Sequence, residues 1–278
     1  MSPPDLKGRR AILDVHTRNK PLSKNVDLGT LARQTSGLSG AELANLCNEA
    51  AIRCARRRGR ALTQGDFDGA FERVVAGVRS RRALNQHERR VVAFHEAGHA
   101  LVGELLPGVD RPHRVSIVPR GSALGYAMSL PEEDRYLKTR RELIDRIAVL
   151  LAGRSAEQLV FGEVTTGAAD DLKRVAEITH AMVHQYAMGS AETPQRAVLE
   201  VDAVSDITLR IRDEEQRELA FEGQSLAQAL LGAHRQKLDQ LAHELLEREA
   251  LDRRDLDRIL GEARKLRVAA ISGESAGS

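Results

Sequence analysis

The sequence His95-Glu96-Ala97-Gly98-His99 places two histidines four residues apart, with a glutamate directly after the first. On an α-helix, residues i and i+4 lie one above the other on the same face, so two neutral imidazoles there can bind one metal ion. A glutamate at this position can reach a water on the metal and act as its general base. The spacing predicts a zinc site with hydrolytic chemistry, most often peptide-bond cleavage.

A buried helix is predicted around this pair. Asn85 and Glu88 have the spacing of a capping box, which starts a helix, and Pro107-Gly108 ends it. The apolar residues between these signals leave almost no continuous polar face: Val91, Val92, Phe94, Ala97, Ala100, Leu101, Val102, Leu105 and Leu106. A helix that is apolar nearly all round is buried. Buried histidines and a glutamate need partners, and a metal ion would satisfy all three.

A catalytic zinc usually takes a third protein ligand, and the best candidate follows a second helix start at Thr165. Asp170 and Asp171 lie in the first turn of that helix. Asp171 borders the predicted buried stripe, whereas Asp170 aligns with the polar side, so the pattern favours Asp171 as the ligand. Alternatively, both acids only offset the helix dipole. The stripe is predicted to contain Leu172, Val175, Thr179, Met182, Val183 and Tyr186.

His180 and His184 form a second pair at helical spacing, but no glutamate follows His180 and the pair departs from the apolar stripe. We therefore expect no metal role for them. Cys47 and Cys54 lie seven residues apart on one predicted helix and are expected to be buried thiols of a reducing compartment, not a disulfide or a metal pair.

The 278 residues favour two domains, mainly α-helical. Helical patterns up to Val78 predict a small helical bundle, and residues 77–82 are the expected linker. Residues 113–130 alternate in short β-like runs that fit a small hairpin, which is either a substrate-binding sheet edge or a purely structural flap. Residues 205–260 are predicted to be helical and charged, and the tail from about residue 266 is predicted to be disordered.

The chain resembles the C-terminal half of the FtsH family of ATP-dependent zinc metalloproteases. The resemblance covers nearly the whole chain and includes the segment around the histidine pair. It also includes residues 39–43 and 48–51, which are similar to the family's ATPase lid. The further matching segments are 118–121, 123–126, 130–135, 151–154 with 156–157, and 165–168 with 170–172. After Met182-Val183 the family usually has an aromatic residue, Gly and Met, whereas this chain has Ala187 in place of the Gly.

The resemblance implies a AAA lid at residues 1–78, a mostly helical zinc-metallopeptidase domain with a small β-hairpin or sheet at 79–265, and a disordered tail at 266–278. It implies one zinc per chain, held by His95, His99 and Asp171, with Glu96 as the catalytic residue. Glu157 matches a family glutamate near the metal that would orient a histidine. The family further implies protein substrates, a homo-hexamer, an ATPase module, and a membrane anchor with this part in the cytoplasm or an organelle stroma or matrix.

Several classes of function are disfavoured. The phosphate-binding Gly-x-x-x-x-Gly-Lys-Ser/Thr loop does not occur in the sequence, so ATP is expected to act only through the ATPase subdomain that this chain lacks. The net charge of +2 gives no reason to expect nucleic acid, and the arginine run at residues 53–60 is expected to be a solvated face or subunit contact. No apolar stretch long enough for a transmembrane helix occurs, so this chain is expected to be soluble. The competing hypotheses are a non-catalytic ring-assembly scaffold and an ATPase regulator that acts through the lid.

Overall fold

The structure is a computed structural model, and it describes residues 3–75, 84–119, 124–129, 137–189 and 206–261. The chain divides into two compact units. The first unit contains residues 1–83 and 118–136, and the second contains residues 84–117 and 137–278. The predicted linker at 77–82 and the tail at 266–278 lie outside the described residues.

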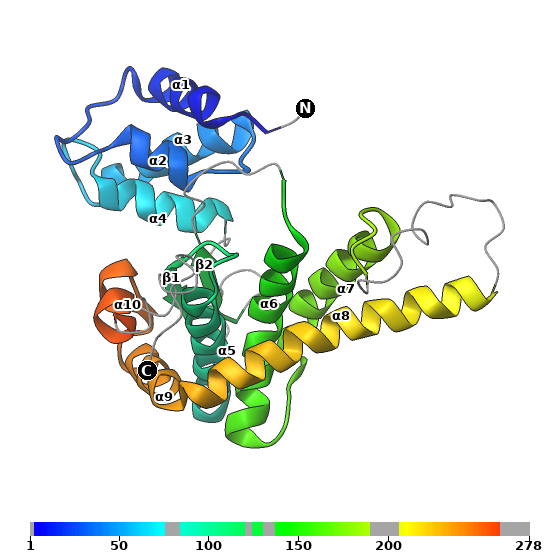
Figure 1. Ribbon diagram of the computed structural model, residues 1–278. Coiled ribbons are helices and arrows are strands. Elements are labelled where there is room, and N and C mark those ends of the chain that lie inside the picture. Colours follow the sequence, from blue (N-terminus) through cyan, green and yellow to red (C-terminus); the bar gives the residue numbers. More distant parts are fainter. Residues whose placement is uncertain (1–2, 76–83, 120–123, 130–136, 190–205, 262–278) are drawn as a thin grey trace, which may run out of the picture. The chain divides into compact units, whose positions relative to one another are not determined.

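The described residues of the first unit form a small bundle of four helices (Figure 1): α1 (Leu6–Thr17), α2 (Leu28–Gln34), α3 (Gly40–Arg56) and α4 (Gln64–Val75). The first three begin at Asp5, Asp27 and Ser39, whose side chains accept hydrogen bonds from backbone N–H groups of the first turn. Leucines, alanines and two phenylalanines from these helices form the core, together with the free thiols of Cys47 and Cys54, both of them buried as predicted.

The second unit is built on a buried helix, α5 (Gln86–Leu105), which begins with the predicted capping box between Asn85 and Glu88. The other helices of the unit are α6 (Arg140–Phe161), η1 (Thr166–Ala168), α7 (Ala169–His184), α8 (Asp206–Ala233), α9 (Arg235–Arg248) and α10 (Arg253–Leu260). Helix α6 packs against α5 and α8, and α7 packs against α6 and α8, so α6 lies at the centre of the unit. The prediction of a mainly α fold is confirmed.

A small sheet contains β1 (Pro112–Ser116), β2 (Tyr126–Ser129) and β3 (Ala250–Leu251), in the order β2-β1-β3. The hairpin region was predicted, but β3 was not, because residues 205–260 were expected to be helical throughout. Helix α9 ends at Arg248, because Glu249 takes a left-handed conformation with φ of +62°. The next two residues pair antiparallel with β1. A strand of two residues leaves too short a pattern to recognise in a sequence.

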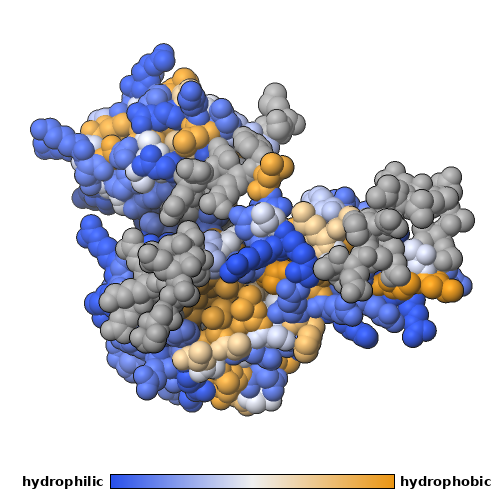
Figure 2. Space-filling view, viewed as in Figure 1, coloured by the Kyte–Doolittle hydropathy of each residue, from blue (hydrophilic) through white to orange (hydrophobic). Residues whose placement is uncertain are grey.

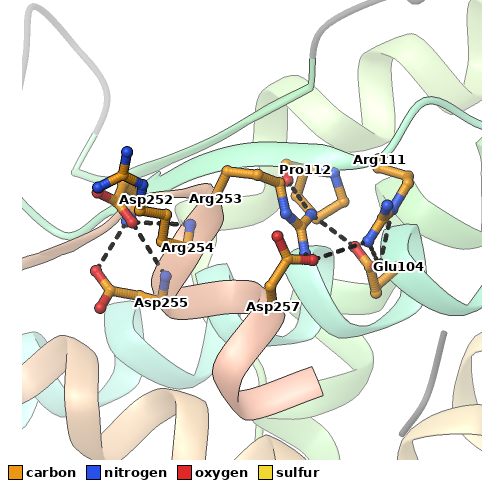
Figure 3. A network of polar contacts seen from close by, with 8 residues as sticks. All are labelled: Glu104, Arg111, Pro112, Asp252, Arg253, Arg254, Asp255 and Asp257. Atoms are coloured by element: carbon orange, nitrogen blue, oxygen red, sulfur yellow. Dashed lines mark hydrogen bonds and ion pairs between the residues drawn. The ribbon is translucent and has the colours of Figure 1, made fainter. Parts of the chain in front are cut away.

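A buried polar network fixes the C-terminal end of α5 (Figure 3). Glu104 is 1% exposed and accepts hydrogen bonds from Arg111, which directly precedes β1, and from Arg253 on α10. Arg253 also donates to the carbonyl of Pro112 at 2.6 Å, and Asp257 contacts both arginines. The network therefore ties α5, β1 and α10 together, five residues beyond His99.

Most of the large exposed apolar side chains lie on helices, and Ile207, Leu209 and Phe221 of α8 are 73%, 46% and 68% exposed. In Figure 2 an apolar surface is visible at the right, where the start of α8 lies in Figure 1. Among the described residues, the helices all fall short of the length and apolar character that a membrane span needs.

Candidate metal centre

Helix α5 presents His95, Glu96 and His99 from a buried position. His95 is 7% and Glu96 6% exposed, and the two imidazole rings stand 4.7 Å apart edge to face. The apolar residues that surround these positions in the sequence place α5 inside the second unit, as the apolar pattern predicts. The two histidines therefore face one point in a largely dry environment.

Asp171 faces the two histidines from α7. Its Oδ2 lies 3.5 Å from Nε2 of His95 and 3.3 Å from Nε2 of His99, whereas Asp170 is exposed. Thr165 caps the preceding η1 turn by accepting a hydrogen bond from Gly167 N–H, which sets the direction in which the chain enters α7. The three residues that are predicted from the sequence as metal ligands therefore lie together in the structure.

Two members of the predicted buried stripe on α7 are exposed, which corrects that part of the sequence interpretation. Leu172 is 41% and Tyr186 53% exposed, while Val175, Thr179, Met182 and Val183 are buried. Leu172 lies in the first turn, before α7 packs against its neighbours. Tyr186 follows the end of the helix at His184, where the chain turns through Ala187 with φ of +51°.

The far nitrogen of each histidine is held by a separate group on α6. His95 Nδ1 lies 2.6 Å from Glu157 Oε1, and His99 Nδ1 lies 2.7 Å from the carbonyl oxygen of Val149. A carbonyl oxygen only accepts, so Nδ1 of His99 carries the hydrogen, and a neutral ring then has its lone pair on Nε2. Both rings therefore turn Nε2 toward Asp171, the orientation that metal-binding histidines require.

Glu157 also connects two parts of the site. Its other carboxylate oxygen, Oε2, accepts a hydrogen bond of 2.6 Å from the backbone N–H of Thr165, where the turn that leads to Asp171 begins. One buried carboxylate thus orients His95 and anchors the segment that carries the acidic ligand. The resemblance suggested the first of these roles, but the second requires knowledge of the fold.

The electrostatics of the site favour a positive charge between these groups. Burial opposes the charged form of His95, but hydrogen bonds to Asp171 and Glu157 raise its pKa to about 10. Burial likewise opposes ionisation of Asp171, yet hydrogen bonds from His95 and His99 hold the pKa of its carboxyl well below the usual range. The carboxylate of Asp171 therefore stays ionised, so this set of donors is suited to a cation.

The donor set fits zinc in type and spacing. A tetrahedral zinc ion with bonds of about 2.0–2.1 Å keeps its ligand atoms roughly 3.3 Å apart, close to the 3.3 Å and 3.5 Å that separate Asp171 from the two imidazoles. All three donor atoms lie within 4.8 Å of one another. Three protein ligands from imidazole and carboxylate are typical of catalytic zinc, which keeps one position for water.

Glu96 differs from Glu157 in its surroundings. Within the described parts of the chain its carboxylate has no hydrogen-bond partner, and burial raises its pKa, partly opposed by the nearby His99 and His95. Glu157, which is also buried, accepts from His95 and Thr165, and its pKa is lowered. A carboxylate with a raised pKa and free acceptor atoms is suited to proton transfer.

The second histidine pair contains no comparable arrangement. His180 and His184 stack face to face with ring centroids 4.1 Å apart, and His180 is exposed. In the described residues, His95, His99 and Asp171 are the only group of three His, Cys, Asp or Glu side chains close enough to bind one ion.

Comparison with protein families gives two matches. The model of Peptidase family M41 matches residues 82–259, and that of the AAA+ lid domain matches residues 25–69. The two matches do not overlap, and the AAA+ lid match precedes the peptidase match in the chain.

Curated relatives extend over most of the chain. Proteins named ATP-dependent zinc metalloprotease FtsH are 44% identical over 271 residues in Pseudothermotoga lettingae, 42% over 277 residues in Thermotoga maritima and 45% over 273 residues in Ralstonia pickettii. These alignments cover 92%, 94% and 92% of this chain. They cover only 43%, 45% and 38% of the relatives, so the chain spans less than half the length of each.

Proposed function

The chain belongs to peptidase family M41, and from this membership we propose that it is the proteolytic part of an ATP-dependent zinc metalloprotease that degrades unfolded or membrane-associated proteins. We assign His95, His99 and Asp171 as the zinc ligands, Glu96 as the general base and Glu157 as the residue that orients His95. The observation that carries the proposal is the convergence of three donor atoms within 4.8 Å, on helices whose side chains are already held in place.

Zinc, when bound, lowers the pKa of a coordinated water and polarises the carbonyl of the scissile peptide. The protein supplies the proton transfers. Glu96, buried and without another hydrogen bond among the described residues, accepts the proton of the attacking water and delivers it to the leaving amine. Glu157 and the Val149 carbonyl keep both imidazoles fixed while this occurs.

The substrate is proposed to add as a strand to the small sheet. In the order β2-β1-β3, β1 is the inner strand, so β2 is the outer strand of the hairpin among the residues that the structure describes. A substrate strand that is added to a sheet edge binds through hydrogen bonds of its backbone. This mode of binding therefore accepts many sequences, as a protease for unfolded proteins requires. A proline scan across Tyr126–Ser129 should raise KM for an unfolded substrate, and an unchanged KM throughout would assign the hairpin a structural role.

The whole protein is proposed to assemble as a homo-hexamer fed by an ATPase module and anchored to a membrane, with this part in the cytoplasm or an organelle stroma or matrix. The names of the relatives, which state ATP dependence, support the ATPase module.

The decisive experiment for catalysis is Glu96→Gln. The amide keeps the size of the side chain but cannot accept the proton, so the variant should bind one zinc per chain and lose casein cleavage by at least 100-fold. Zinc is measured by elemental analysis on the same sample. Substantial cleavage by a variant with full zinc content would contradict the general-base assignment.

The ligand assignment is tested with two neighbouring acids. Asp171→Ala should lose zinc, whereas Asp170→Ala, which removes an exposed carboxylate from the same turn, should retain it. The reverse result would show that the wrong acid has been chosen. A wild-type chain that binds no zinc and cleaves no unfolded substrate would instead favour the non-catalytic assembly scaffold.

A further inference from the structure

The ring of His95 occupies the space that a side chain at position 153 would fill. A Cβ atom built on Gly153 of α6 would lie 2.5 Å from Nε2 and 2.6 Å from Cδ2 and Cε1 of His95. Real Cβ atoms essentially never approach another atom within 3.0 Å. These three consecutive ring atoms are centred on Nε2, the nitrogen that faces Asp171, and their nearly equal distances place the added Cβ over the face of the ring.

His95 cannot readily move to make room. Its ring is 9% exposed, and the opposite nitrogen is held 2.6 Å from Glu157, a carboxylate that is itself 1% exposed. Glu157 is fixed in turn by the Thr165 N–H. The ring is therefore held by a carboxylate at Nδ1, and one of its faces lies against the bare backbone of α6 at Gly153.

Gly98, on the facing helix α5, has a different role from Gly153. A Cβ on Gly98 would lie 2.6 Å from the carbonyl oxygen of Ala152 and 2.9 Å from Cβ of Ala156. Those contacts are with backbone and a methyl group, so Gly98 serves the close packing of α5 and α6. At Gly153, in contrast, the three atoms nearest to an added Cβ all belong to the imidazole ring of His95.

We propose that Gly153 is a positioning residue for the metal centre: the absence of a side chain at this position sets where Nε2 of His95 lies relative to His99 and Asp171. This inference rests on the proposed zinc site. A methyl group at 153 would collide with the face of the imidazole and displace Nε2 from the point where the three donors converge. A glycine in the interior of α6 otherwise has no advantage, because glycine is a poor helix former.

The first test compares Gly153→Ala with Gly103→Ala in the full chain. A Cβ at Gly103 would make only ordinary contacts, 3.7 Å from Pro112 and 4.0 Å from Val149, so this variant controls for helix propensity. Gly153→Ala should weaken zinc binding by about 10–100-fold in a chelator competition, as loss of a ligand-orienting contact does. The visible spectrum of the Co²⁺-substituted protein should also change. Wild-type affinity and an unchanged spectrum would overturn the proposal.

A double-mutant cycle without metal covers the case in which Gly153→Ala folds poorly. The substitution should destabilise the metal-free wild-type chain, but not the His95→Ala chain, in which the clashing ring is absent. Equal destabilisation in both backgrounds would mean that Gly153 serves helix packing alone, which would contradict the proposal. Since this cycle uses neither zinc nor cleavage, its outcome is independent of whether the proposed function is correct.

Discussion

At the scale of residues, two buried glutamates lie next to His95, and their pKa values are shifted in opposite directions. Glu96 follows His95 in the sequence, and its raised pKa comes from burial. Glu157 reaches His95 from α6, and the hydrogen bonds that it accepts lower its pKa despite burial. One carboxylate can therefore exchange a proton, while the other remains an anion that fixes a ring.

The role of Glu157 leads to a prediction. In Glu157→Gln the amide keeps the shape of the side chain but removes its negative charge. The carboxylate accepts one hydrogen bond on each oxygen, whereas the amide has a single oxygen, so either His95 or Thr165 loses its acceptor. We expect zinc affinity to fall about 10–100-fold while Glu96 remains intact. Affinity is measured against a chelator, with Asp170→Asn as the control of equal charge change. A variant that binds zinc like the control would show that the charge of Glu157 is dispensable.

The residues of the site differ in how visible they are in the sequence. His95, Glu96 and His99 follow from spacing, and the preference for Asp171 over Asp170 from helical periodicity. Glu157 was reached only through resemblance, since nothing local distinguishes it from other helical glutamates. Val149 contributes a carbonyl oxygen and Gly153 an absence of side chain, so neither leaves a chemical signal before the register of α5 against α6 is known.

At the scale of elements, helix ends were the most predictable feature because caps are local chemistry. The capping box at Asn85 appears as the sequence predicts, and Ser39 begins α3 with the same kind of box. The sheet was harder: β3 pairs with β1 from more than 130 residues away, through Val115 with Leu251 and Ser116 with Ala250. Such a pairing depends on the tertiary packing that brings α9 and α10 to this side of α5, which no local pattern encodes.

The turn after α7 contains a conformational cost that can be removed. Ala187 has φ of +51°, a region that disfavours side chains with a Cβ, and it stands where the resembling family usually has glycine. Ala187→Gly should raise the free energy of unfolding by about 1 kcal/mol. The reciprocal control is Gly162→Ala at the end of α6, where φ is +76° and a loss of similar size is expected. Urea denaturation measures both, and destabilisation by Ala187→Gly would contradict the explanation.

The network around Glu104 predicts a large effect outside the site. Removing this carboxylate in Glu104→Ala leaves Arg111 and Arg253, each about one-fifth exposed, without their buried anion. Breaking such a partnership from one side costs about 3–5 kcal/mol in the free energy of unfolding. The exposed pair of Arg258 and Glu244 serves as the control, since Arg258→Ala should have far less effect. Similar losses in the two variants would mean that the Glu104 network is no more than a surface pair.

At the scale of the whole molecule, each compact unit has a core of its own, and the proposed zinc ligands all belong to the second. The first core is built from α1 to α4, and the second contains residues of α6, α7 and α8. Helix caps and apolar stripes predict a helical bundle up to residue 78 and a second helical domain after it. The grouping of residues 118–136 with the first unit could not be predicted, because it depends on packing that leaves no periodic pattern in the sequence.

Removal of zinc should therefore destabilise one unit selectively. A ligand whose free concentration is 1,000 times its Kd adds about 4 kcal/mol to the free energy of unfolding. For a domain of this size, that energy corresponds to a rise in Tm on the order of 10 °C. Since the chain contains no tryptophan, Phe161→Trp in the second unit and Phe71→Trp in the first provide separate fluorescent probes. EDTA should lower the Tm that the Phe161→Trp probe reports and leave the Tm that the Phe71→Trp probe reports unchanged. Equal shifts at both probes would show that the chain unfolds as one cooperative body, and no shift at either would contradict the zinc site.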